Sequence, residues 1–224
     1  MINKTRFPNI YEMRKGKHKV LLTKNLSKGK KVYGEDLISE GGVEYRTFDP
    51  NRSKLAASMM KAISQTGFKD DQTILYLGAS TGTTPSHVSD IVGDGGKVFC
   101  VEFAPRVARE LVAVCEDRSN MTIMLADANK PETYANKILE ADIVYMDIAQ
   151  KNQAEIFLKN CKMFLKKGGF GLLALKSRSV DVTKKPKEIY KQIRAQLERE
   201  ITIVDYRELD PFEKDHAMFV VKKK

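Results

Sequence analysis

The fold class of this 224-residue chain is indicated by the stretch Thr73-Ile-Leu-Tyr-Leu-Gly-Ala-Ser-Thr-Gly-Thr-Thr-Pro85. Its first five residues are of strand type, and a glycine-containing turn follows them directly. Thr84 before Pro85 predicts that a helix begins there, with Thr84 as its N-cap. A strand, a tight turn and a helix in immediate succession form the first βα unit of a parallel sheet.

The same alternation continues along most of the chain. Further strands are predicted at residues 97–102, 121–125, 143–146 and 170–175, with two closing strands at 201–206 and 217–221. Helical spacing of apolar residues predicts helices before, between and after these strands. These helices are expected at 51–65, from 105, at 131–139, around 157–165 and at 186–200. Nearly continuous apolar strands joined by amphipathic helices predict a mostly parallel seven-stranded α/β sheet with helices on both faces.

The first 50 residues differ from the rest. Short β-type pieces punctuated by glycines predict a small β-rich N-terminal subdomain at 1–50, and the main domain would then span 51–224. Of the net charge of +10, residues 1–31 carry +9. Such a basic segment is typical of a polyanion-binding surface and equally of a solvated face.

Composition excludes several classes of protein. Three cysteines without a Cys-x-x-Cys motif argue against a disulfide scaffold and a cysteine zinc site, and three scattered histidines predict no metal site. The N-terminus does not resemble a signal peptide, and no apolar run approaches the roughly 18 residues that span a bilayer. We expect a soluble, cytoplasmic protein without a membrane partner.

Ligands of parallel sheets bind beyond the carboxyl ends of the strands, so the residues that follow each strand are the candidates. The turn after the first strand is neither a Walker A loop nor a three-glycine dinucleotide loop. Glu102 could accept both hydroxyls of a ribose, or it could simply stabilise the start of a helix. Phe103 could pack on an adenine ring or lie in the core. Asp127 could bind the adenine amino group or cap a helix.

Two charged residues end strands that are otherwise apolar. Asp147 follows the run 143–146, and Lys176 follows 172–175. Because these strands are successive, we expect the two side chains to be neighbours, either as a working pair or as a structural ion pair. A lysine at the end of a buried strand is unfavourable unless it is paired or functional. A lone histidine such as His216 is more often structural than catalytic.

The segment Tyr76-Leu-Gly-Ala-Ser-Thr-Gly-Thr-Thr-Pro-Ser-His-Val-Ser-Asp-Ile91 resembles fibrillarin, the S-adenosylmethionine-dependent RNA 2′-O-methyltransferase of C/D-box guide ribonucleoproteins. Further matching segments are Glu44-Tyr-Arg46, Arg52-Ser-Lys-Leu-Ala-Ala57, Val101-Glu-Phe103, Asp147-Ile-Ala-Gln150 and Asp215-His-Ala217. The resemblance covers about residues 7–222. The chain lacks the Gly/Arg-rich tail of eukaryotic fibrillarins and is therefore similar to the archaeal form. Pro85 departs from the family pattern, in which valine is more usual.

The resemblance implies a Rossmann-like class I methyltransferase fold and S-adenosylmethionine as cofactor. It implies a catalytic set of Lys54, Asp147, Lys176 and His216. The implied cofactor contacts are Gly78, Ala79, Ser80, Thr83, Thr84, Glu102, Phe103, Asp127, Ala128, Asp147, Ile148, Ala149 and Gln150. The implied partners are a C/D-box guide RNA, target rRNA or tRNA, a Nop-domain scaffold protein and a kink-turn-binding ribosomal-type protein.

These residues lead to a mechanistic hypothesis. Neutral Lys176 would accept the proton of the ribose 2′-hydroxyl, with Lys54 lowering its pKa and Asp147 orienting it. His216 would position this group or the ribose. The enzyme could instead work mainly by alignment. The rival functions are methyl transfer to a protein side-chain amide, a nicotinamide-dependent oxidoreductase and a non-catalytic ribonucleoprotein scaffold.

Overall fold

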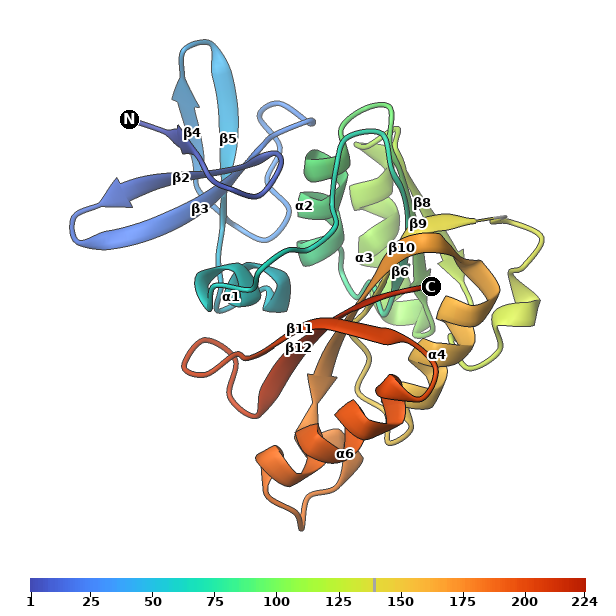
Figure 1. Ribbon diagram of the computed structural model, residues 1–224. Helices are drawn as coiled ribbons and strands as arrows, with labels where there is room; N and C mark the ends of the chain where they lie inside the picture. Colours follow the sequence, from blue (N-terminus) through green and yellow to red (C-terminus); the bar gives the residue numbers. More distant parts are fainter. Residues whose placement is uncertain (139) are drawn as a thin grey trace.

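Seven strands form one sheet in the order β11-β12-β10-β9-β6-β7-β8 (Figure 1). The structure is a computed structural model that describes residues 1–138 and 140–224. All neighbouring strands of this sheet are parallel except β12, which is antiparallel to both β10 and β11. The strands are β6 (Thr73–Leu77), β7 (Lys97–Glu102), β8 (Met121–Leu125), β9 (Ala141–Met146), β10 (Leu165–Lys176), β11 (Thr202–Glu208) and β12 (His216–Lys222). The predicted mostly parallel seven-stranded sheet is confirmed.

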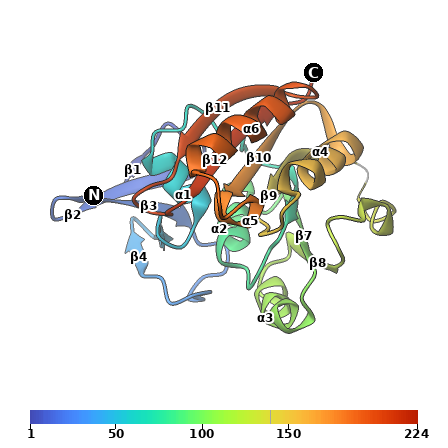
Figure 2. The ribbon, with the colours of Figure 1, turned by 90° about the horizontal axis from the view of Figure 1, so that it is seen from below.

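Helices cover both faces of this sheet, as predicted (Figure 2). One apolar core contains residues of α1, α2 and α3, and the other contains residues of α4 and α6. The helices are α1 (Lys54–Met60), α2 (Thr83–Val92), α3 (Pro105–Glu116), α4 (Gln153–Phe164), α5 (Ser177–Val180) and α6 (Pro186–Glu198). None of the described helices has both the length and the apolar content to cross a membrane.

The chain winds outward in both directions from β6, and this positions the site. From β6 it proceeds through β7 to β8 on one side, and β9 and β10 lie on the other side. The carboxyl ends of β6 and β9 therefore border the switch point of the sheet, where ligands of such folds bind.

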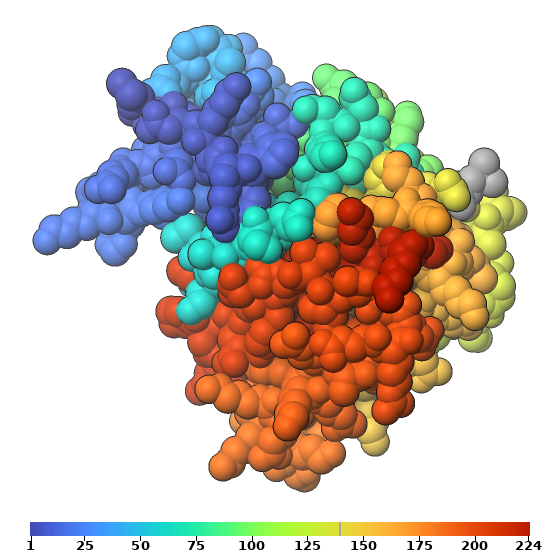
Figure 3. Space-filling view, in the orientation of Figure 1, coloured from blue at the N-terminus to red at the C-terminus, as the bar shows by residue number. Residues whose placement is uncertain are grey.

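A second, antiparallel sheet has the order β1-β2-β3-β5-β4. Its strands are β1 (Asn3–Lys4), β2 (Ile10–Lys15), β3 (His18–Lys24), β4 (Leu37–Glu40) and β5 (Val43–Phe48). In Figure 3 these blue residues form a lobe against the teal residues that include α1. All five strands fall within the predicted β-rich segment 1–50.

A buried charge network joins the N-terminal sheet to α2 and to the segment between α3 and β8. Arg46 of β5 binds Glu35 and, at 2.9 Å, Asp90 of α2. Asp90 also accepts a hydrogen bond from Arg118 at 2.6 Å. All four side chains are essentially inaccessible to water. We call Glu35, Arg46, Asp90 and Arg118 the junction cluster.

Two helix predictions were wrong in extent. The helix expected at 51–65 is confined to α1, because Ala62 adopts a left-handed backbone with φ of +58° just beyond its end. The helix expected at 131–139 is a single 3₁₀ turn, η1 (Pro131–Thr133). There Tyr134 is buried and donates a hydrogen bond to Asn160 at 2.6 Å, which holds its ring in the core. Leu139 lies outside the described residues.

Candidate active site

The turn after β6 brings two strand ends unusually close together. Gly78 has a φ of +79°, and a Cβ atom there would lie 2.3 Å from the backbone oxygen of Asp147 at the end of β9. Only glycine permits this approach. Gly82 has a φ of +92° and caps α2, which begins at Thr83. The predicted N-cap, Thr84, was therefore wrong, because the left-handed glycine starts the helix earlier.

A pocket of about 280 Å³ lies at the carboxyl ends of β6, β7, β8 and β9. It brings together most of the residues expected to hold a cofactor. The predicted residues that line it are Gly78, Ser80, Glu102, Phe103, Asp127, Ala128, Asp147, Ile148, Ala149 and Gln150. The other three expected residues lie elsewhere: Ala79 is buried, Thr83 lines a different hollow and the Thr84 hydroxyl donates to Ser53 at 3.0 Å.

Glu102 is held at the mouth of this pocket by backbone groups. One carboxylate oxygen accepts the N–H of Ser80 at 2.8 Å, and the other accepts that of Ala104 at 2.9 Å. The carboxylate therefore satisfies the chain before α3, and its remaining lone pairs leave the ribose interpretation open. The neighbouring Phe103 ring is 68% exposed, which excludes the core alternative.

The loops after β8 and β9 are tied together on the far side of the pocket. Asp127 accepts the N–H of Asn129 at 2.9 Å, and the Asn129 amide donates to Gln150 at 2.6 Å. The Asp127 carboxylate thus stabilises its own turn, and its remaining lone pairs are available to a ligand amino group.

Next to the pocket, Asp147 forms an ion pair with Lys54. Lys54 Nζ lies 2.9 Å from Asp147 Oδ2, and both side chains remain partly accessible. Burial lowers the pKa of Lys54, but the charge and hydrogen bond of Asp147 raise it more, so the pKa lies above its ordinary value of 10.5. Lys54 is therefore an ammonium ion at neutral pH.

This pairing corrects the sequence-based hypothesis about Lys176. The partner of Asp147 is Lys54, which the first helix presents from 93 residues away. Lys176 ends β10 as expected, but its side chain is exposed, so the argument from a buried lysine was wrong. The backbone of Lys176 is fixed by Gln153 of α4, whose amide donates to its carbonyl and accepts its N–H, both at 3.0 Å.

His216 completes the group at this edge of the sheet. It pairs with Lys176 in the β10–β12 register. Its Nδ1 lies 2.7 Å from the carbonyl of Lys214, which can only accept, so Nδ1 carries the proton and Nε2 has a free lone pair. Burial, and secondarily Lys54, hold the pKa of His216 below its ordinary 6.5 despite the Lys214 hydrogen bond. We call Lys54, Asp147, Lys176 and His216 the edge cluster.

Three further residues at this edge carry no strong signal in the sequence. Ser53 caps α1, Gln153 holds the Lys176 backbone, and Glu213 lies 3.9 Å from the His216 ring. Ser before a helical run is an N-cap signal that the interpretation of residues 51–65 as one helix concealed. Glu213 lies in a loop without a motif. Among residues 1–138 and 140–224, no group of three or more His, Cys, Asp or Glu side chains is arranged to hold a metal ion.

Comparison with known proteins agrees with this geometry. The family model described as Fibrillarin matches residues 1–224. The chain belongs to the fibrillarin family. A fibrillarin relative from Methanocaldococcus jannaschii, named fibrillarin-like rRNA/tRNA 2′-O-methyltransferase, is 54% identical over 216 residues, covering 96% of this chain and 94% of the relative.

Two solved fibrillarin structures show the same fold. Aeropyrum pernix fibrillarin, in complex with natively bound S-adenosyl-L-methionine, has a TM-score of 0.92 and 41% identity over 99% of this chain and 97% of its own. A fibrillarin/Nop5p complex contains a chain with a TM-score of 0.88 and 36% identity, covering 99% of this chain and all of that one. The family resemblance inferred from the sequence is confirmed.

Proposed function

We propose that this chain is an S-adenosylmethionine-dependent methyltransferase that modifies the 2′-hydroxyl of ribose in rRNA and tRNA. The observation that carries the proposal is the continuity of the pocket with the edge cluster, since Asp147 both lines the pocket and binds Lys54. Membership of the fibrillarin family, with a relative named as an rRNA/tRNA 2′-O-methyltransferase, supports the same reaction.

The residues of the pocket fit S-adenosylmethionine. The Glu102 carboxylate suits two ribose hydroxyls, the exposed Phe103 ring suits the adenine face, and Asp127 suits the adenine amino group. The bound cofactor supplies a methyl group made electrophilic by a cationic sulfur. Asp147, which also lines the pocket, would supply a negative charge to that cation.

The ribose hydroxyl must lose its proton as its oxygen forms a bond to the methyl carbon. Lys54 is unsuited to accept that proton, because its pKa is raised by Asp147. Lys176 remains the proposed base, and because its side chain is exposed, the bound RNA must remove water from it. His216 is a second candidate acceptor, since its lowered pKa and its Nδ1 hydrogen bond leave Nε2 free.

Single-turnover rates of variants distinguish Lys176 from His216 as the proton acceptor. Removing the true base lowers the single-turnover rate by roughly 100-fold or more. Lys176→Ala is expected to show this loss with cofactor binding intact, while a comparable loss in His216→Gln alone would assign the proton transfer to histidine. Near-wild-type rates in both variants would mean that catalysis rests on alignment.

We further propose the assembly in which the enzyme works. A C/D-box guide RNA selects the target by base pairing, a Nop-domain scaffold protein holds the catalytic subunit, and a kink-turn-binding protein completes the particle. The crystallised fibrillarin/Nop5p complex supports the scaffold partner. Segment 1–50 would serve as a docking or RNA-facing subdomain beside a methyltransferase domain at 51–224, in the cytoplasm of an archaeal cell.

The decisive experiment uses labelled S-adenosylmethionine, the guide RNA, the scaffold partners and two target RNAs, one of which carries 2′-deoxyribose at the predicted position. Label in the ribose substrate alone is expected. Label in both would place the acceptor elsewhere and overturn the proposal. No label in either, with cofactor bound, would favour methylation of a protein amide or a scaffold role.

A further inference from the structure

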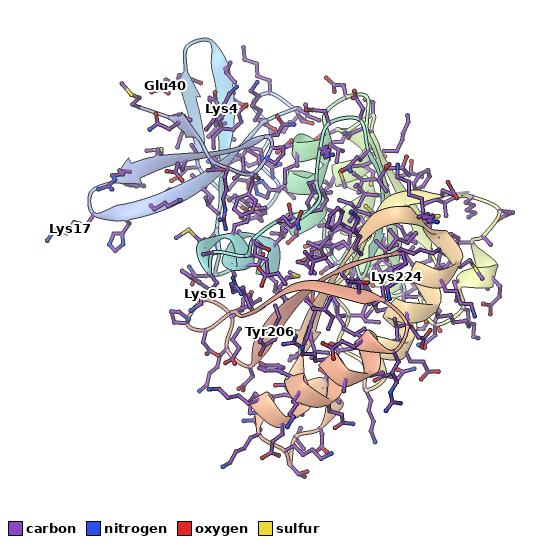
Figure 4. The ribbon with its side chains drawn as sticks, in the orientation of Figure 1. Lys4, Lys17, Glu40, Lys61, Tyr206 and Lys224 are labelled. Atoms are coloured by element: carbon purple, nitrogen blue, oxygen red, sulfur yellow. The ribbon has the colours of Figure 1, made fainter. Side chains whose placement is uncertain are left out.

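A second pocket, of about 230 Å³, lies between α6 and β11, outside the site described above. Figure 4 labels Tyr206 on β11, the strand that runs beside α6. The residues that line this pocket combine aromatic rings with cations and one carboxylate: Lys187, Tyr190, Lys191, Arg194, Tyr206, Glu208 and Phe219.

The aromatic residues form a small cluster of mutually tilted rings. The centroid of the Tyr206 ring lies 4.8 Å from that of Phe219 and 6.0 Å from that of Tyr190. Phe219 and Tyr190 are buried, while Tyr206 is partly accessible. A partly accessible ring backed by two buried rings is a rigid platform on which a planar base can stack.

The cations come from one face of α6. Lys187, Lys191 and Arg194 are spaced four and three residues apart, so their exposed side chains project from the same side of the helix. Arg194 is also bound to Glu198 at 2.9 Å, which leaves the two lysines as the available cations. The Glu208 carboxylate, which accepts the Tyr206 hydroxyl at 3.2 Å, provides an acceptor for a base amino group.

The pocket lies close to the edge cluster. Glu208 pairs with Ala217, and the preceding residue, His216, pairs with Lys176. The hydroxyl of Tyr190 is buried beside Ser177, the residue after Lys176, and makes no hydrogen bond of normal geometry in the described part of the chain. Such an unsatisfied buried group is uncommon and marks a place where a ligand or water can bind.

A basic segment of the chain, residues 176–191, begins at Lys176 of the edge cluster and ends at Lys191 of the pocket between α6 and β11. Between Lys176 and Lys191 the chain carries many cations and few acids. The cations are Lys176, Arg178, Lys184, Lys185, Lys187 and Lys191, against Asp181 and Glu188. Arg178 is paired with Asp215 and Lys184 lies 3.9 Å from Asp181, so Lys176, Lys185, Lys187 and Lys191 remain as cations for the phosphates of a strand whose ribose lies at Lys176.

We propose that the α6–β11 pocket binds one unpaired nucleotide of the RNA strand that carries the target ribose. The base stacks on Tyr206, and its phosphate contacts Lys187 and Lys191. Aromatic stacking beside a cationic groove is the chemistry with which proteins bind single-stranded nucleic acid. The inference rests on the proposed function, and it adds a fixed second contact that sets the direction of the strand across the edge cluster.

The test uses the assembled particle and target RNAs with 4-thiouridine placed in turn at each position around the target nucleotide. Photocrosslinks to α6 or β11 are expected from one position. In Tyr206→Leu, the RNA concentration for half-maximal single-turnover rate should rise about tenfold, the size of one base–aromatic stack, while the rate at saturating RNA is retained. Tyr206→Phe keeps the ring and should behave as wild type.

Lys187→Gln with Lys191→Gln should also weaken RNA binding and make its logarithmic salt dependence shallower by about 0.7, the contribution of the one phosphate that both lysines contact on a single strand. The matched control is Lys69→Gln with Lys97→Gln, two exposed lysines near the amino ends of β6 and β7.

Each outcome decides the proposal. Pocket variants that bind RNA like the control, or a scan without a crosslink to α6 or β11, would overturn it. Crosslinks from the pocket to the scaffold protein would show that the surface docks protein instead. The crosslink and the salt dependence do not require methyl transfer, so they remain informative if the proposed function itself fails.

Discussion

The junction cluster and the edge cluster use similar side chains for opposite purposes. At the junction, Arg46 donates to Glu35, Asp90 and Ser86, and no part of its side chain is accessible to water. At the edge, Lys54 and Asp147 share one contact and keep 18% and 25% of their side-chain surface accessible. Charges that are fully buried and fully partnered hold elements together, whereas charges with spare hydrogen-bonding capacity at a pocket can act on a ligand.

The largest loss of stability is expected from a substitution in the junction cluster. Asp90→Asn removes the carboxylate that two buried arginines share, and an uncompensated buried charge costs about 3–5 kcal/mol. We expect the free energy of unfolding, measured in urea, to fall by this amount. Asp36→Asn is the control, because Asp36 meets Lys15 only at 3.4 Å on an exposed surface and should change stability by less than 1 kcal/mol. A loss of similar size in both variants would refute the distinction.

The next effect concerns the edge. Asp147→Asn keeps the size of the side chain but removes the charge that fixes Lys54, and a misplaced catalytic group lowers the rate by about 100-fold. Since the pair is partly exposed, the free energy of unfolding should change by no more than about 1 kcal/mol. Single-turnover rates and urea unfolding on the same preparation check both statements. A large loss of stability with a normal rate would place Asp147 among the structural charges.

A smaller effect appears as pH dependence of stability at the junction. His87 contacts Thr23 at 2.8 Å and Tyr33 at 2.7 Å, and burial, aided by Arg46 and Arg118, holds its pKa well below 6.5. The folded state then stays neutral while the unfolded state takes up a proton. The free energy of unfolding should therefore fall as pH drops below 6.5, by up to about 1.4 kcal/mol per pH unit for this group.

In His87→Gln, the pH dependence of the free energy of unfolding below pH 6.5 should become shallower by the same amount. His216 contributes in the same direction, because its pKa is also lowered, so the difference between wild type and variant isolates His87. The lowered pKa of Glu35 acts in a separate window, since its contribution is lost only as pH falls below 4.5. An unchanged slope in the variant would contradict the assignment.

The smallest effect is expected where α2 contacts the cap of α1. Thr84→Val removes the hydrogen bond to Ser53, the cap of the helix that carries Lys54. We expect a loss of about 1 kcal/mol in stability and a fall of a few-fold in rate. Thr122→Val on exposed β8 is the control and should leave both unchanged. A rate equal to wild type would show that α1 is held without this bond.

The positions of the strands along the chain and most of the residues that line the pocket at their carboxyl ends were predictable, because both depend on local pattern. Apolar runs marked the strands, and the polar residue that ends each run, such as Glu102 or Asp147, was placed by the rule that strand ends converge. This rule does not show which of these side chains bind one another. It paired Asp147 with Lys176, its neighbour along the sheet, whereas the structure pairs it with Lys54.

The errors share a physical cause. Helical periodicity cannot show that a left-handed residue such as Ala62 ends α1 early, nor that Gly82 replaces Thr84 as the cap of α2. The junction cluster was also invisible in the sequence, because Arg46, Asp90 and Arg118 each look like ordinary surface charges in local context. Their burial depends on the N-terminal sheet packing against α2.

Residue type and spacing alone specify the parallel sheet, the glycine turn, the separate N-terminal strands and the family. The tertiary structure decided which charges are buried, that Lys54 is the partner of Asp147, and that His216 carries its proton on Nδ1. It also decided that aromatic rings and lysines from α6 and β11 share a pocket. The reason is that burial, ion pairing and pKa depend on distances between residues far apart in the chain.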